Sequence, residues 1–125
     1  MTRSRTSAKA AGTRTETAAV NYLRTHVGDD RIERRRLSGS KDRGDVTGLR
    51  TPHGHRMVVE IKDCSRIEVT KWLNEAEVER GNDDSSLGVV IAKRHGKGAP
   101  GDLLVMLTLR DFVALLTGRR PEDDT

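Results

Sequence analysis

Apolar residues gather in a few short segments of this chain, and the spacing within each segment predicts its secondary structure. Three segments repeat their apolar residues with the period of an amphipathic helix. The first is expected to run from near Thr13 to Gly28, the second over residues 69–80, and the third between Thr108 and Gly118. A glycine follows each segment, as is common at the C-termini of helices.

The other apolar segments are too short for helices and are expected to form strands. They are residues 31–37, 45–49, 57–62, 87–92 and 103–107. The run over 87–92 is unbroken, as expected of a central strand with both faces covered. Helices and strands are intermixed along the chain, which predicts an α/β fold with a mixed β-sheet flanked by helices.

The same spacing assigns an inner and an outer face to the last two helices. In the helix over 69–80, we expect the charged residues to form a mostly solvated outer face: Lys71, Glu75, Glu77 and Glu79. In the last helix, we expect the apolar stripe to face the core: Leu109, Phe112, Val113 and Leu116. Both helices would then cover the sheet with their apolar sides.

Length and composition limit the class of protein. With 125 residues the chain is expected to hold one domain at residues 12–118, between a mobile basic tail at 1–11 and a polar tail at 119–125. No apolar run is long enough to span a membrane. The single Cys64 excludes an internal disulfide and a cysteine-based zinc site. These features predict a protein of the cytoplasm.

The charge of the chain favours a polyanionic partner. The formal net charge is +4 and the sequence pI is about 9.6, which suits nucleic acid. Aromatic residues are only 2% of the chain, too few to stack many single-stranded bases, so duplex or branched DNA is the expected partner. The basic residues expected to grip its phosphates are Arg34, Arg35, Arg36, Lys41, Arg43, Lys93, Arg94 and Lys97. For each of them, plain solvated surface charge is the alternative.

The strand over 57–62 carries an acid and a base two residues apart. Side chains alternate along a strand, so Glu60 and Lys62 share one face while Val59 and Ile61 share the other. Buried charges cost desolvation energy unless they are solvated, paired or used. A salt bridge at the strand end is one interpretation. The other is the site of a metal-dependent nuclease, which needs more acids from elsewhere in the chain.

Two further acids could reach Glu60. If the strand that begins at Asp45 pairs as a hairpin with the strand of Glu60, the two carboxylates lie close together. Glu16 could approach from the first helix, although Thr13 and Glu16 also fit a capping box at its start. Carboxylate oxygens suit Mg²⁺, or Mn²⁺ in its place, and such an ion activates water and stabilises phosphoryl charge. Lys62 could orient that water, help to deprotonate it, or stabilise the transition state.

These residues, taken in order, resemble a known group of nucleases. Gly44-Asp45 followed by Val59-Glu60-Ile61-Lys62 is similar to the motif of the PD-(D/E)XK nuclease superfamily. Gly12-Thr13-Arg14-Thr15-Glu16 at a helix start, and Leu37-Ser38-Gly39-Ser40 before the aspartate, resemble archaeal-type Holliday junction resolvases. The likeness covers about residues 12–93. It departs at Gly44, where the superfamily's name has proline, and at Asn74, Glu75 and Glu77, where many relatives carry a glutamine; Glu77 is therefore not counted as a site residue.

The resemblance implies a restriction-endonuclease-like core and a Mg²⁺-dependent endonuclease. Glu16, Asp45 and Glu60 would correspond to the metal-binding acids, and Lys62 to the catalytic lysine. Ser40 matches a loop serine next to the site in the junction resolvases.

The resemblance also implies a homodimer that cuts symmetric strands of a four-way junction, in DNA recombination or repair in a prokaryote or a phage. The apolar segments 103–107 and 112–116 could supply the dimer interface, and core packing is an equal use for them. A nicking or restriction-like endonuclease of the same superfamily is one alternative. A catalytically inactive DNA-binding module is another.

Overall fold

The computed structural model describes residues 4–36 and 39–122, so the first serine of the Ser38-Gly39-Ser40 loop and the outermost tail residues lie outside it. The main elements are α1 (Arg5–Leu23), β1 (Glu33–Arg34), β2 (Val46–Thr47), β3 (Met57–Lys62), α2 (Val69–Asp83), β4 (Leu87–Ala92), β5 (Leu104–Met106) and α3 (Leu109–Thr117). A π-helical turn, Arg24–Gly28, follows α1, and a 3₁₀ turn, Pro100–Asp102, precedes β5.

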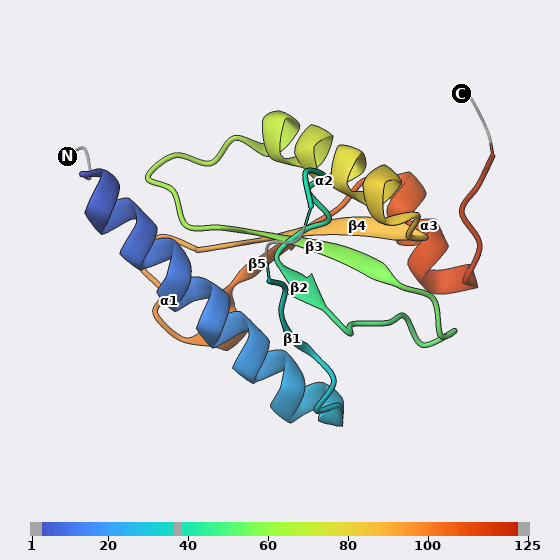
Figure 1. Cartoon of the computed structure of the whole chain (residues 1–125), viewed down its shortest axis with the longest axis horizontal. Helices are drawn as coiled ribbons and strands as arrows, with labels where there is room; N and C mark the ends of the chain where they lie inside the picture. Colours follow the sequence, from blue (N-terminus) through green and yellow to red (C-terminus); the bar gives the residue numbers. More distant parts are fainter. Residues whose placement is uncertain (1–3, 37–38, 123–125) are drawn as a thin grey trace.

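The larger sheet has the order β3-β4-β5 (Figure 1). β4 is the central strand, parallel to β3 and antiparallel to β5, so the sheet is mixed. The short strands β1 and β2 pair antiparallel in a separate sheet. The prediction of an α/β fold with a mixed sheet is confirmed at this level, and the predicted central strand over 87–92 is found with the same bounds.

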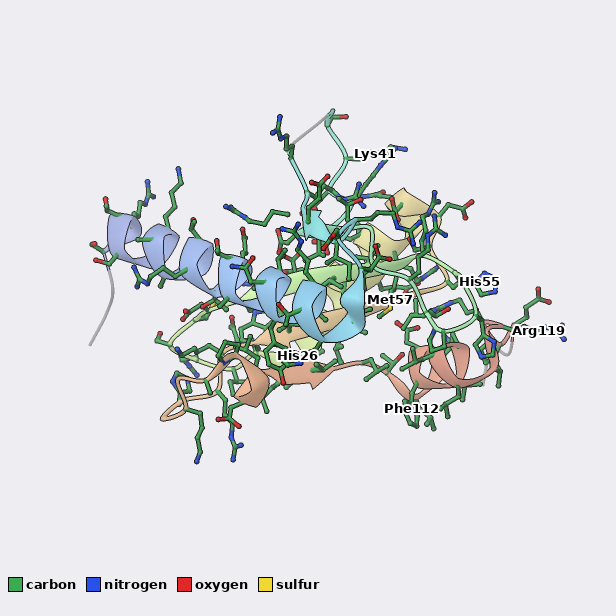
Figure 2. All side chains as sticks on the ribbon, turned by 90° about the horizontal axis from the view of Figure 1, so that it is seen from below. His26, Lys41, His55, Met57, Phe112 and Arg119 are labelled. Atoms are coloured by element: carbon green, nitrogen blue, oxygen red, sulfur yellow. The ribbon has the colours of Figure 1, made fainter. Side chains whose placement is uncertain are left out.

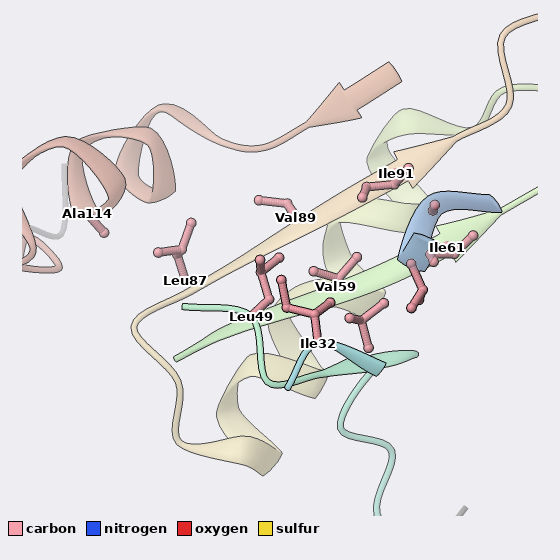
Figure 3. Close-up of a cluster of buried hydrophobic side chains, with 11 residues drawn as sticks. Ile32, Leu49, Val59, Ile61, Leu87, Val89, Ile91 and Ala114 are labelled. Carbon is pink, nitrogen blue, oxygen red and sulfur yellow. The ribbon is translucent and has the colours of Figure 1, made fainter. Parts of the chain in front are cut away.

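Helices cover both faces of this sheet, with α1 on one side and α2 on the other (Figure 1). Odd-numbered residues of β3 and β4 pack with residues of α1, of β2, of the segments next to β1 and β2, and with one alanine of α3 (Figure 3). This cluster consists of Val59, Ile61, Leu87, Val89, Ile91, Ala19, Val20, Ile32, Val46, Leu49 and Ala114. The even-numbered Val90 and Ala92 pack instead against Trp72 and Ala76 of α2. Each fully buried aliphatic side chain contributes about 1.5–3 kcal/mol, so these clusters fix which face each strand residue takes.

The alternation of side chains along β3 decides on which face of the sheet Glu60 and Lys62 lie. Because Val59 and Ile61 face α1, the side chains of Glu60 and Lys62 lie on the α2 face of the sheet. The segment of Asp45 runs beside β3, since the Asp45 amide donates to the Val59 carbonyl at 2.7 Å and the Met57 amide donates to the Leu49 carbonyl at 3.3 Å. The expected hairpin neighbourhood is present, although β2 and β3 belong to different sheets.

Two helix boundaries differ from those predicted. α1 begins at Arg5, with the hydroxyl of Ser4 accepting from the Ser7 amide, so the capping box at Thr13 and Glu16 is wrong and residues 5–11 are helical. α2 continues past Gly81 to Asp83, and Asp84 caps it in the left-handed conformation at φ 53°. A single glycine in an exposed helix costs only about 1 kcal/mol, which neighbouring packing outweighs.

The predicted inner face of α3 is also wrong. Leu109 is 77% exposed, Leu116 60% and Phe112 43%, while Ala114 and Asp111 are buried. Asp111 explains the rotation: its carboxylate accepts from the Gly88 amide at 3.1 Å and pairs with Arg120. This polar anchor turns part of the apolar stripe outward, on the side opposite to the core.

Candidate active site

The backbone of β3 fixes the Asp45 side chain next to Glu60. The Oδ2 atom of Asp45 accepts a hydrogen bond from the Ile61 amide at 2.7 Å, so the carboxylate is fixed beside the residue that separates Glu60 from Lys62. Glu60 itself is only 8% exposed. The structure therefore brings together the aspartate and glutamate that the sequence placed in one site.

A further acid, Glu79 of α2, joins Glu60. Asp42, Glu60 and Glu79 each offer a carboxylate oxygen, and these oxygens all lie within 4.8 Å of one another. Glu79 is 3% exposed, so its assignment to a solvated outer face is wrong. Its position could have been found from spacing, because Glu79 follows Trp72 by seven residues and Ala76 by three, on the same buried stripe of the helix.

The electrostatics of this group reflect burial and crowding of like charges. Burial, followed by close contacts with Glu79 and Asp45, raises the pKa of Glu60 to about 11. Burial also raises the pKa of Glu79 to about 7, with the charges of Asp42 and Asp45 adding to the shift while the contact with Glu60 opposes it. Without a cation, the group therefore keeps a proton on Glu60 at neutral pH. A bound cation can replace that proton, because metal ligation requires the ionised carboxylate.

Glu16 is near Asp45 but is not one of the three clustered acids Asp42, Glu60 and Glu79. Its Oε2 atom is 2.9 Å from Nη2 of Arg34, which pairs with it from β1. Burial and then the charge of Asp45 raise the pKa of Glu16, and the contact with Arg34 opposes them. Ser40 is exposed in the loop that leads to Asp42.

Lys62 is held by α2 rather than by Glu60. Its Nζ atom is 2.6 Å from Oε2 of Glu75, which was predicted to be on a solvated face. Burial alone would lower the pKa of Lys62, but the hydrogen bond to Glu75 and the charges of Glu60 and Glu75 raise it overall. Lys62 is thus a cation at neutral pH, placed to attract negative charge near Glu60.

An open groove of about 720 Å³ runs past Asp45 between α1 and the loop before β2. Basic residues dominate its lining, and acids occupy one part of it: Lys9, Arg34, Arg35, Arg36, Lys41, Arg43, Glu16, Asp42 and Asp45. Arg35 is partly engaged, with Nη2 3.6 Å from Oδ1 of Asp83. Arg36, Lys41 and Arg43 are exposed.

The remaining predicted DNA contacts lie elsewhere. Lys93 and Lys97 line a second groove of about 450 Å³ that runs along a neighbouring face of α1, together with Arg14. Arg94 is exposed between them. The eight basic residues therefore divide between two grooves, and the larger of these adjoins the acids.

Comparison with known proteins adds no further assignment. No protein-family model matches the chain, and neither curated proteins nor solved structures yield a match. Within residues 4–36 and 39–122, none of the helices combines the length and hydrophobicity needed to cross a membrane.

Proposed function

We propose that this protein is a Mg²⁺-dependent, structure-selective DNA endonuclease of the PD-(D/E)XK type, acting as a Holliday junction resolvase. The observation that carries the proposal is the bond from the Ile61 amide to Asp45, which sets that carboxylate beside Glu60 and Lys62 at the end of a basic groove. Acids that bind a metal, a lysine and a phosphate-binding surface are the parts that phosphodiester hydrolysis requires.

Asp45 and Glu60 would hold the ion, and Glu16, whose pKa is raised in part by the charge of Asp45, would add a further ligand. The donor set fits Mg²⁺, because it is made of carboxylate oxygens and includes Glu60, whose pKa is raised first by burial and then by the acids around it. When bound, the ion supplies a more acidic water and stabilises charge on the phosphoryl oxygens. Mn²⁺ would serve in its place.

Lys62 would act through its positive charge. Its raised pKa keeps it protonated at neutral pH, so a role as general base is disfavoured. The ammonium can orient the attacking water and attract the charge that develops on the phosphate. Glu75 fixes the direction of the side chain, since its Oε2 lies 2.6 Å from Nζ.

The substrate we propose is duplex or branched DNA, bound by a homodimer. The outward apolar side of α3 and the exposed Val105 on the edge strand β5 supply a candidate surface for a second copy. Phe112 on α3 lies on the opposite side of the molecule from Lys41, so a partner there would leave the basic loop open to DNA (Figure 2). A two-fold dimer suits a four-way junction, which has matching symmetry.

A cleavage assay with Mg²⁺ tests this proposal. An immobile four-way junction is compared with a linear duplex of the same arms, with and without EDTA. Paired symmetric nicks in the junction and an intact duplex are expected. Equal cutting of both substrates would leave a nuclease of the same type without junction preference. If the protein binds both substrates but cuts neither in Mg²⁺, the catalytically inactive DNA-binding module is favoured.

The double variant Lys41→Ala with Arg43→Ala should weaken DNA binding and make it less dependent on salt. Each lost phosphate contact lowers the slope of log affinity against log salt by about 0.9, so a change of roughly 1 to 2 is expected. Binding titrations between 50 and 200 mM salt would measure it. Arg50→Ala is a matched control, because Arg50 is exposed but does not line the groove. Its Nη1 atom donates to the Gly54 carbonyl at 2.9 Å. A slope equal to that of the wild type would remove this loop from the DNA surface.

A further inference from the structure

Glu79 stands apart from the other acids of α2 because it has no basic partner among the described residues. Glu75 pairs with Lys62 at 2.6 Å, and Glu77 with Arg80 and Arg120 at 2.6 and 3.1 Å. Asp83, at the end of the helix, lies 3.6 Å from Arg35. Glu79 is more deeply buried than any of these acids, and its carboxylate lies close to those of Glu60 and Asp42.

The buried Glu79 carboxylate is also incompletely satisfied. Its Oε2 atom is out of contact with solvent, and no hydrogen-bond partner reaches it within the described part of the chain. An isolated buried carboxylate costs several kcal/mol unless it is paired, protonated or bound to a metal. A residue in this condition, aimed at Glu60 and Asp42, indicates a ligand that is positively charged.

The loop before β2 is fixed where it completes this group. Nδ2 of Asn82, one turn after Glu79 on α2, donates to the Asp42 carbonyl at 2.8 Å. The Gly44 amide donates to Oδ1 of Asp42 at 2.9 Å. These bonds hold the Asp42 carboxylate beside Glu79 although Asp42 itself is exposed, so the group stays open to ions from solvent.

We propose that Asp42, Glu60 and Glu79 form a second divalent-cation site, next to the proposed Asp45–Glu60 site and sharing Glu60 with it. Three carboxylates suit a hard cation such as Mg²⁺, Mn²⁺ or Ca²⁺, with water completing its shell. Asp42 gives access from the groove, Glu79 supplies buried charge, and Glu60 bridges the two positions. The use of this cation in cleavage rests on the proposed function, whereas its binding does not.

Calorimetric titration of the DNA-free protein with Mn²⁺ tests the site directly. The wild type should bind one equivalent more than Glu79→Gln, or bind the same number with an affinity roughly tenfold higher or more. Asp42→Asn should show the same loss, and since Asp42 is exposed this variant should fold normally. Glu77→Gln is the matched control on the same helix, and its titration should equal that of the wild type.

The outcomes separate the two proposals. Thermal denaturation in EDTA first shows whether Glu79→Gln and Asp42→Asn are folded. If both folded variants bind Mn²⁺ as the wild type does, the second site is wrong even where the protein cleaves junctions. If both variants lose the equivalent while wild-type protein cuts no DNA, the cation site stands and the proposed nuclease function fails. Loss of the equivalent in Glu77→Gln as well would also overturn the site, because it would show a non-specific response to charge.

Discussion

Replacing Asp45 with asparagine should lower junction cleavage by roughly a thousand-fold or more, while DNA binding stays within a few-fold of wild type. The side chain keeps its shape, and its oxygen can still accept from the Ile61 amide, as Oδ2 does now at 2.7 Å. What is lost is the negative charge that would hold a cation beside Glu60. Single-turnover cleavage of a labelled four-way junction in Mg²⁺ measures the effect.

Thermal stability distinguishes this loss from unfolding. Asp45 raises the pKa of Glu60 by contact and by its charge, so removing that charge from the metal-free protein relieves repulsion. The melting temperature of Asp45→Asn in EDTA should equal or exceed that of the wild type. Asp84→Asn is a suitable control, since Asp84 is exposed at the end of α2. Near-normal cleavage by Asp45→Asn would refute the assignment of Asp45 to the site.

The strands were predictable where hydrophobicity alone decides the structure. Leu87 to Ala92 is apolar throughout, and all six residues of β4 are buried in the centre of the sheet. Strand parity then placed Glu60 and Lys62 on one face, as expected, because Val59 and Ile61 fill the core on the other. The position of Asp45 near Glu60 was also predictable, because the segment that begins at Asp45 was expected to lie beside β3.

The helices were less predictable, because polar anchors override hydrophobic spacing. Asp111 is buried by its bonds to Gly88 and Arg120, and no apolar pattern reveals those partners. For the same reason α3 exposes Leu109 and Leu116. Glu79 is different: its spacing from Trp72 places it on the buried stripe, but its charge favoured an exposed position. A charged residue at a buried helical position marks either a structural ion pair, as at Asp111, or a functional site, and the absence of a basic partner for Glu79 among the described residues favours the second.

Gly44 lies between Asp42 and Asp45 in the loop, and its backbone geometry restricts which residue can stand there. Its φ is +91°, in the region that favours glycine. Proline is restricted to φ near −65°, so the proline of the superfamily's name is incompatible with this conformation. Gly44 also donates from its amide to Asp42, a bond that proline would remove.

Gly44→Ala should therefore destabilise the protein by about 2–4 kcal/mol and reduce cleavage beyond what the loss of folded protein explains. A Cβ atom at this position would lie 2.9 Å from the Val59 carbonyl oxygen and 2.9 Å from Cγ1 of Val58, so β3 or the loop must shift. That shift would strain the bond from the Asp45 amide to Val59 and move the Asp45 carboxylate away from Glu60.

Urea denaturation in EDTA gives the change in free energy of unfolding, and cleavage at low temperature, where the variant is folded, gives the loss at the site. Gly81→Ala is the matched control, because Gly81 is helical and exposed with nothing within 4 Å of an added Cβ. It should stabilise the protein by up to about 1 kcal/mol. If Gly44→Ala were as stable as the wild type, the loop would not depend on this backbone conformation. If it were unstable but cut normally when folded, Gly44 would serve the fold without positioning Asp45.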